Sequence, residues 1–311
     1  MTPHHHDHHG HDHHHHGHSH APDNFDRAFA VGLALNIGFV AVEVVFGVLA
    51  NSLALLADAG HNLSDVARLL LAWGAAWLGR RKPTARRTYG YGRASILAAM
   101  ANAAILLIAI GAIGWEALRR FSHPSPIEPG VVMAVAAAGI VINTTTALMF
   151  ARGRKNDLNI RGAFLHMLTD AAVSAGVVVA GLAVSLTGWL WLDPLTSLLI
   201  VAVIAIGTWS LLRESIAMAV DTVPAGIDRD QVCAFLRGQK GVREVHDLHI
   251  WPLSTTSTAL TAHLVKEGAA IDDHLTASIV SDLKHRFGIS HATLQFETGR
   301  VPCDLEPESV V

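Results

Sequence analysis

Long apolar stretches dominate this sequence and leave it few possible folds. The hydrocarbon core of a bilayer is about 30 Å thick, and a helix needs about 20 residues to cross it. Six stretches of suitable length lie between Gly, Pro or charged residues, at positions 29–50, 53–78, 96–118, 130–151, 163–186 and 190–212. With 51% hydrophobic residues and only 16% charged ones, the chain is too apolar for an ordinary soluble protein. We therefore predict an all-α, six-helix transmembrane domain over residues 25–212, embedded in a lipid bilayer.

Basic residues between the apolar stretches indicate how this domain is oriented. Short loops that carry an excess of Lys and Arg remain on the cytoplasmic side of a membrane. Lys and Arg are concentrated between the second and third stretches and between the fourth and fifth, whereas Arg119 and Arg120 stand out on the other side. We therefore expect both chain termini in the cytoplasm, and the location that we expect is the inner (plasma) membrane of a bacterium.

The residues that follow position 212 have the composition of a small soluble domain. Alternating and amphipathic patterns predict helices at 228–239 and 272–287 and strands at 242–253, 257–267 and 291–297. This order predicts a cytoplasmic α+β domain over residues 213–300, of the ferredoxin-like αββαβ type, with a regulatory and dimerisation role. We expect residues 301–311 to form a loose tail.

Most of the 21 histidines lie within the first 24 residues. Asp and Gly interrupt them repeatedly, which is unlike an expression tag. Nothing in this segment can bury a core, so we expect it to be disordered, and neutral imidazoles make it a candidate metal-collecting tail. The net charge of −3 includes no basic excess, so nucleic acid is not an expected partner. The two cysteines, Cys233 and Cys303, do not suggest a disulfide framework.

Ionisable residues interrupt two of the apolar stretches. Charged groups near the centre of a bilayer are costly and mark functional sites. Asp58, His61 and Asp65 share one stripe of the second predicted helix, and His166 and Asp170 lie one turn apart on the fifth. If these faces pack together, two imidazoles and two carboxylates converge into a set suited to tetrahedral zinc. A single polar residue would instead favour hydrogen bonding between helices.

Other polar residues of the predicted membrane helices are candidates for an ion pathway. Asp58 shares the stripe of His61 and Asp65 but would be a fifth ligand, so it is either a pathway residue or a hydrogen-bonding one. Glu43 is ionisable, and Asn36 lies on its helix. Asn143 lies on the fourth predicted helix. Helix packing explains the two asparagines nearly as well.

Several segments together resemble the cation diffusion facilitator family, and most closely its zinc-transporting branch. They are "SLALLADAGHNLSD", "RRTYGYGRASILAAMANA", "HMLTD" and "VHDLHIW", and the resemblance extends over roughly residues 25–300. It implies a homodimeric metal-ion/proton antiporter whose transport site is His61, Asp65, His166 and Asp170. Some relatives bind a second metal in the loop between the second and third helices, but this loop lacks the Asp and His residues required.

A second metal site is expected in the cytoplasmic domain. Strand alternation places His263, His291 and Glu297 on one polar sheet face, and His249 can join them. The family resemblance instead favours His246 with His263 and Glu297. Cys303 is a further candidate ligand. The alternative is a solvated strand face that forms a dimer contact.

These observations predict a divalent cation exporter that exchanges metal, most directly Zn²⁺, for protons by alternating access. Metal binding requires neutral imidazoles and ionised carboxylates, so it displaces protons. We also expect Zn²⁺ as a regulatory ligand. An exporter of cadmium, cobalt or nickel with the same mechanism is the first alternative, and a membrane-bound metal sensor is the second. We do not expect an enzyme, because His-Glu-x-x-His is missing and four protein ligands leave no open position for water.

Overall fold

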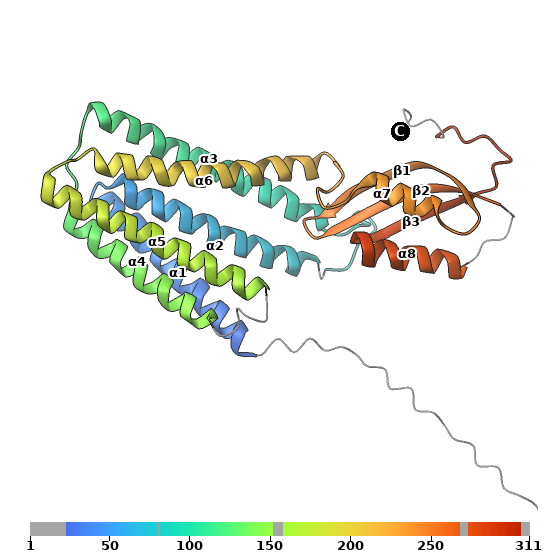
Figure 1. Ribbon diagram of the computed structural model, residues 1–311, viewed down its shortest axis with the longest axis horizontal. Coiled ribbons are helices and arrows are strands. Elements are labelled where there is room, and N and C mark those ends of the chain that lie inside the picture. The colour runs from blue at the N-terminus through green and yellow to red at the C-terminus, as the bar shows by residue number, and fades with distance from the viewer. Residues whose placement is uncertain (1–22, 80, 152–157, 268–272, 306–311) are drawn as a thin grey trace, which may run out of the picture.

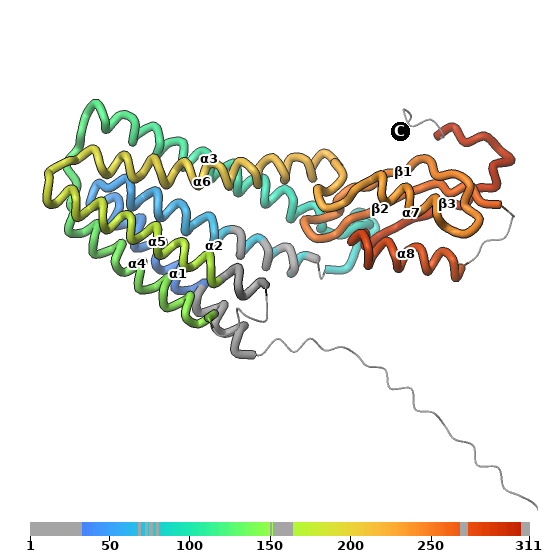
Figure 2. Tube along the Cα trace, viewed as in Figure 1, coloured from blue at the N-terminus to red at the C-terminus, as the bar shows by residue number. Residues whose placement is uncertain are grey.

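The computed structural model describes residues 23–79, 81–151, 158–267 and 273–305. The predicted His-rich tail falls almost entirely outside these residues. The described part contains six long helices, which run side by side, and a small α+β domain at one end of them (Figures 1 and 2). The long helices are α1 (Asp23–Leu49), α2 (Leu53–Gly79), α3 (Gly92–Ser122), α4 (Pro129–Phe150), α5 (Leu158–Thr187) and α6 (Leu192–Ala219).

Four of the described helices, α3, α4, α5 and α6, are long and apolar enough to cross a membrane. Sequence analysis predicts six spans. In α1 the apolar portion among the described residues is shorter, Leu33–Leu49, and in α2 charged residues interrupt the apolar pattern. Large side chains such as Ile108 and Ile206 are about three-quarters exposed, at 74% and 75%. Exposed apolar surface of this kind is typical of contact with lipid.

The first turn of α2 is held by residues from two other helices. Asp193 of α6 accepts hydrogen bonds from the Ser52 hydroxyl and from the backbone N–H groups of Leu53, at 2.8 Å, and Ala54, at 3.3 Å. Arg120 of α3 donates to the backbone carbonyl of Asn51, at 2.6 Å. The first N–H groups of a helix have no partner within the helix, so Asp193 caps α2 from outside. No pattern in the sequence predicts this role for Asp193.

The C-terminal domain follows the predicted order of helix, strand, strand, helix and strand. The sheet has the strand order β1-β2-β3, with β1 and β2 antiparallel and β2 and β3 parallel. Leu236 of α7 and Leu283 of α8 belong to one buried cluster with Leu260 and Leu264 of β2, so both helices cover the same face of the sheet. The bounds are α7 Arg229–Arg237, β1 Val242–Ser254, β2 Ser257–Lys266, α8 Asp273–Phe287 and β3 Ile289–Glu297.

The beginning of α3 packs directly against the turn between β1 and β2. Arg93 donates two hydrogen bonds to the carboxylate of Asp221, which follows α6, at 2.7 and 3.0 Å. The hydroxyl of Ser95 accepts a hydrogen bond from the backbone N–H of Thr255 at 3.2 Å. A Cβ atom on Gly92 would lie 2.5 Å from the backbone oxygen of Leu253. The helical and α+β parts therefore meet through close backbone contact.

Candidate metal centre

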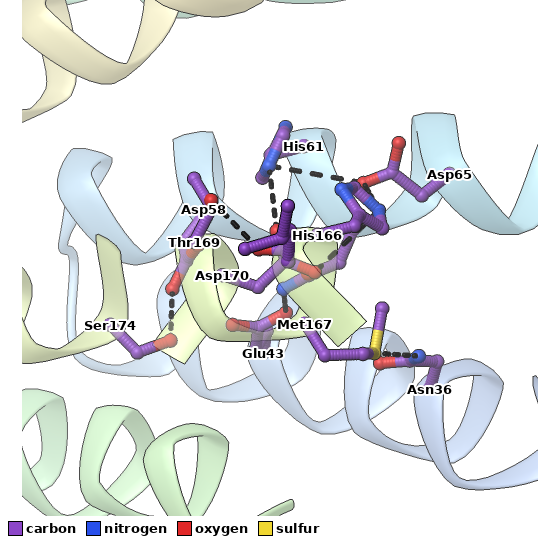
Figure 3. Close-up of polar contacts among 12 residues, drawn as sticks. Asn36, Glu43, Asp58, His61, Asp65, His166, Met167, Thr169, Asp170 and Ser174 are labelled. Atoms are coloured by element: carbon purple, nitrogen blue, oxygen red, sulfur yellow. Dashed lines mark hydrogen bonds and ion pairs between the residues drawn. The ribbon is translucent and has the colours of Figure 1, made fainter. Parts of the chain in front are cut away.

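Two His-x-x-x-Asp pairs face each other across α2 and α5 (Figure 3). His61 Nε2 lies 3.2 Å from Asp170 Oδ1 on the other helix and 3.8 Å from Asp65 Oδ2 on its own. His166 Nε2 lies 3.2 Å from Asp65 Oδ2 and 3.7 Å from Asp170 Oδ2. Each imidazole thus contacts a carboxylate from both helices, because residues four apart share one helix face.

These separations match the requirements of a small tetrahedral cation. Metal–ligand bonds of about 2.0–2.2 Å place neighbouring ligand atoms about 3.3–3.6 Å apart in a tetrahedron. His61, Asp65 and Asp170 each offer a ligand atom within 4.8 Å of the others, and His166 lies within 3.7 Å of both carboxylates. The Asp170 side chain is only 2% exposed, whereas that of His166 is 37% exposed. The four side chains selected from the sequence therefore lie together.

A second layer of polar side chains lies deeper in the helix bundle. Asp58 accepts a hydrogen bond from Ser174 at 3.1 Å, and Glu43 accepts one from Asn62 at 2.9 Å. All four side chains are buried. The sequence pattern predicts the two carboxylates as candidate pathway residues but does not predict their donors. The spacing does indicate that Ser174 is near the site, since it lies one turn after Asp170 on the same face of α5.

The two asparagines predicted as pathway residues have different surroundings. Asn36 donates to the sulfur of Met167 at 3.8 Å, which is a weak contact because thioether sulfur is a weak acceptor. Asn143 is fully buried, and neither polar atom of its side chain has a hydrogen-bond partner among the described residues.

An apolar pocket of about 250 Å³ lies beside His61, between α5 and α6. Its lining includes Val173 and Gly176 of α5 and Thr196 and Leu199 of α6. His61 is thus the ligand candidate that borders open space on this side of the bundle.

The α+β domain brings together three of the five residues predicted for a cytoplasmic site. His246 Nε2 lies 3.4 Å from Glu297 Oε2, and His263 Nδ1 lies 3.0 Å from Glu297 Oε1. His249 contacts Asp247 instead, at 2.8 Å. His291 packs against the ring of Tyr89, with the ring centres 5.4 Å apart.

An irregularity in β1 explains how His246 and His249 come to lie on the same face of the strand. Asp247 has a positive φ of 49°, and the strand register shifts between His246 and His249. His246 pairs with His263 and His249 pairs with Thr261, so β1 uses three steps where β2 uses two. This extra residue is a β-bulge, and it turns both histidines toward the face that carries His263.

Comparisons with known proteins agree with this architecture. Residues 29–218 match the model of the cation efflux transmembrane domain, and residues 224–299 match that of the cation efflux protein cytoplasmic domain. The chain is 38% identical over 280 residues to the zinc transporter ZitB of Escherichia coli, which covers 88% of each chain. It is 35% identical over 282 residues to the cadmium, cobalt and zinc/H(+)-K(+) antiporter of Bacillus subtilis, covering 88% of this chain and 89% of the relative.

A third relative is the metal cation efflux system protein CzcD of Cupriavidus metallidurans. The two chains are 35% identical over 284 residues, covering 91% of this chain and 89% of the relative. The transmembrane match and the four apolar helices together identify an integral membrane protein. Both domain models match in sequence order and together span most of the chain, which therefore belongs to the cation efflux, or cation diffusion facilitator, family.

Proposed function

We propose that this protein exports a divalent cation, most directly Zn²⁺, in exchange for protons. The observation that carries the proposal is the convergence of His61, Asp65, His166 and Asp170 between α2 and α5. Two aspartates neutralise a dication and two neutral imidazoles add no charge, so a metal ion there offsets the cost of burying the carboxylates. In the proposed cycle, alternating access exposes this His2Asp2 site to each side of the membrane in turn.

Proton exchange follows from the chemistry of the same four ligands. A metal ion binds to deprotonated ligands, so its entry releases any protons they hold. Outward movement of a dication against a potential of 100 mV costs about 4.6 kcal/mol, twice the single-charge value. Each returning proton offsets about half of this cost, and each pH unit of inward gradient adds about 1.4 kcal/mol per proton. The Bacillus subtilis relative is named a cadmium, cobalt and zinc/H(+)-K(+) antiporter, which supports exchange of the metal for protons.

The proposed architecture places all six long helices in the inner membrane of a bacterium, with both termini in the cytoplasm. The transport domain covers residues 25–212 and the α+β domain, of ferredoxin-like type, covers residues 213–300. We propose a homodimer that associates through this second domain. The His-rich residues 1–24 collect metal on the cytoplasmic side, where the transport site loads.

The buried polar layer next to the transport site is proposed to line the ion route. Asp58 and Glu43 supply carboxylates there, and Asn36 and Asn143 supply amides on α1 and α4. Buried polar groups without a full set of hydrogen bonds are rare in proteins. The side chain of Asn143, which has no hydrogen-bond partner among the described residues, fits a passage that contains water or an ion during part of the cycle.

Zinc is the proposed substrate because imidazole and carboxylate in a tetrahedral set suit it well. Cadmium, cobalt and nickel are the alternatives, since raw affinity seldom separates these metals. The relative from Bacillus subtilis is named for cadmium, cobalt and zinc, and the relative from Escherichia coli for zinc alone. We further propose that His246, His263 and Glu297 bind a regulatory metal ion in the cytoplasm. His249 and His291 lie outside this cluster.

Zinc-driven proton flux in proteoliposomes tests the proposed function. Wild type is compared with Asp65→Ala and Asp170→Ala at matched protein levels, and Glu128→Ala, which removes an exposed carboxylate at the start of α4, is the control. We expect flux in wild type and in the control and none in the two aspartate variants. Zinc uptake without proton movement would remove the antiport mechanism, and a folded wild type that moves no zinc would favour a metal sensor.

A further inference from the structure

The segment after β3 turns back toward the sheet instead of leaving the domain (Figure 1). The reversal occurs at Gly299, which has a positive φ of 68°, a conformation that side chains rarely adopt. A Cβ atom on Gly299 would lie 3.2 Å from the side chain of Val265 in β2. The turn brings Cys303 Sγ to 3.5 Å from His263 Nδ1. This part of the tail, for which sequence analysis predicts a loose segment, therefore has a defined contact.

Cys303 is the fourth member of a convergent set of ligand atoms. His246, His263, Glu297 and Cys303 each offer one such atom, and all four atoms lie within 4.8 Å of one another. In a tetrahedral site with one sulfur ligand, neighbouring ligand atoms are about 3.3–3.8 Å apart. The observed separations of 3.0 Å and 3.4 Å to Glu297 and 3.5 Å to Cys303 are close to this range.

The surroundings of the two histidines orient them as ligands. Asp247 Oδ2 lies 3.3 Å from His263 Nε2, so a carboxylate holds the ring nitrogen that points away from the cluster. Such an outer carboxylate is the usual companion of a histidine that binds metal. The ring of His246 is buried, and neither of its nitrogens has a hydrogen bond among the described residues. A buried imidazole with this geometry still requires a partner.

We propose that the Cys303 thiolate is the fourth ligand of the cytoplasmic metal site, and that the bound cation fastens residues 299–303 over it. This inference rests on the regulatory site proposed above. Binding forms a metal–sulfur bond and releases the thiol proton to water. The thiolate makes this site softer than the transport site, so it favours zinc and cadmium over oxygen-seeking cations such as Mg²⁺ and Mn²⁺.

Cobalt substitution tests this assignment in the full-length protein purified in detergent. Tetrahedral Co²⁺ bound to a thiolate shows a near-ultraviolet sulfur-to-cobalt charge-transfer band, which imidazole and carboxylate ligands do not produce. Histidines of the N-terminal segment and the transport site therefore do not interfere. Only Cys233 and Cys303 can give the band, because the chain has no other cysteine, and Cys233→Ser on α7 is the matched control for Cys303→Ser.

We expect the band in wild type and in Cys233→Ser, and its loss in Cys303→Ser. Loss of the band in Cys233→Ser instead, or cobalt binding to His246, His263 and Glu297 without any band, overturns the proposal that the Cys303 thiolate is a ligand. Either result leaves the proposed regulatory site standing. To separate these cases, cobalt binding by Cys303→Ser is compared with that of Cys303→Ser combined with His246→Ala. If that second substitution changes nothing and no band is seen in wild type, both proposals fail.

Alkylation by iodoacetamide supplies a second measurement that does not depend on cobalt. Excess zinc should protect Cys303 in wild type and should protect it less in His263→Ala, which retains the thiol. Gly299→Val should also reduce protection, because the bulky residue disfavours the positive φ at the reversal without removing a ligand. Equal alkylation of Cys303 with and without zinc in wild type would contradict the proposal.

Discussion

His61 borders the α5–α6 pocket and supplies one of the two imidazoles of the proposed transport site. We predict that His61→Asp broadens transport toward larger ions, chiefly cadmium, because a carboxylate binds in one- or two-oxygen modes and tolerates longer bonds. The expected rise in the cadmium-to-zinc transport ratio is about tenfold, equivalent to about 1.4 kcal/mol of relative binding. Uptake of both metals into proteoliposomes measures it.

The control for this substitution is His123→Asp, because His123 is an exposed histidine at the C-terminal end of α3 and belongs to neither proposed metal site. Its cadmium-to-zinc ratio should equal that of wild type. An unchanged ratio in His61→Asp as well would show that another residue selects the metal.

The buried hydroxyl of Ser174 and the exposed hydroxyl of Thr169 allow a matched comparison on α5. Ser174 donates to the buried carboxylate of Asp58, whereas Thr169 donates to the backbone carbonyl of Leu165 in its own helix. We predict that Ser174→Ala lowers stability by about 1–2 kcal/mol and that Thr169→Ala has a much smaller effect. Thermal unfolding in detergent is the measurement, and equal losses would argue against a special role for the Asp58 contact.

At the level of single residues, a repeated spacing in the sequence is the best guide to which polar side chains lie together. The His61/Asp65 and His166/Asp170 pairs follow directly from a shared four-residue period on apolar helices. The donors Asn62 and Ser174 could not be assigned in the same way, because their partners come from other helices. Only the packing of α1, α2 and α5 decides which buried carboxylate each one meets.

The beginning of α2 depends on hydrogen bonds to residues of other helices. Asp193→Ala would leave the Ser52 hydroxyl and two backbone N–H groups without an acceptor in a buried place. We predict a loss of about 2 kcal/mol or more, since caps contribute about 0.5–2 kcal/mol and buried unpaired groups cost more. Because α2 carries His61 and Asp65, zinc transport should fall as well.

Glu128 provides the control for Asp193. It occupies the N-cap position of α4, but its side chain makes no capping hydrogen bond there. Glu128→Ala should therefore leave the melting temperature and zinc transport near wild type. Equal melting temperatures for the Asp193 and Glu128 variants would mean that the cap does not stabilise α2.

Sequence periodicity predicts elements better than it predicts their irregularities. The order and type of α7, β1, β2, α8 and β3 follow from local patterns. The bulge at Asp247 escapes such reasoning, because alternation assumes one residue per step along the whole strand. The conformation at Asp247 is stabilised by contacts to His249 and His263, one of which lies on another strand.

At the level of the whole molecule, the contact between Gly92 and Leu253 connects the two parts. Gly92→Ala would place a methyl group 2.5 Å from a backbone oxygen, and relief of such overpacking costs about 1–3 kcal/mol. We predict that the turn at residues 254–257 separates from α3 and that hydrogen–deuterium exchange at Thr255 becomes faster, because its N–H loses Ser95.

Gly111→Ala is the matched control on the same helix, since a Cβ atom there meets nothing within 4 Å. Alanine is favoured over glycine inside a helix by about 0.5–1 kcal/mol, so this variant should be as stable as wild type or more so. Exchange at Thr255 that stays slow in Gly92→Ala would show that the two parts do not depend on this contact.

The same junction has a consequence for protein engineering. The backbone of α3 touches that of the β1–β2 turn, and Arg93 binds Asp221 across the boundary, so the domains are not independent modules that a flexible linker joins. A chimaera that takes its cytoplasmic domain from a relative would have to bring residues 91–95, 221 and 253–257 from the same parent. Exchanges cut only at the end of α6 would produce mismatched surfaces, even if each half folds correctly.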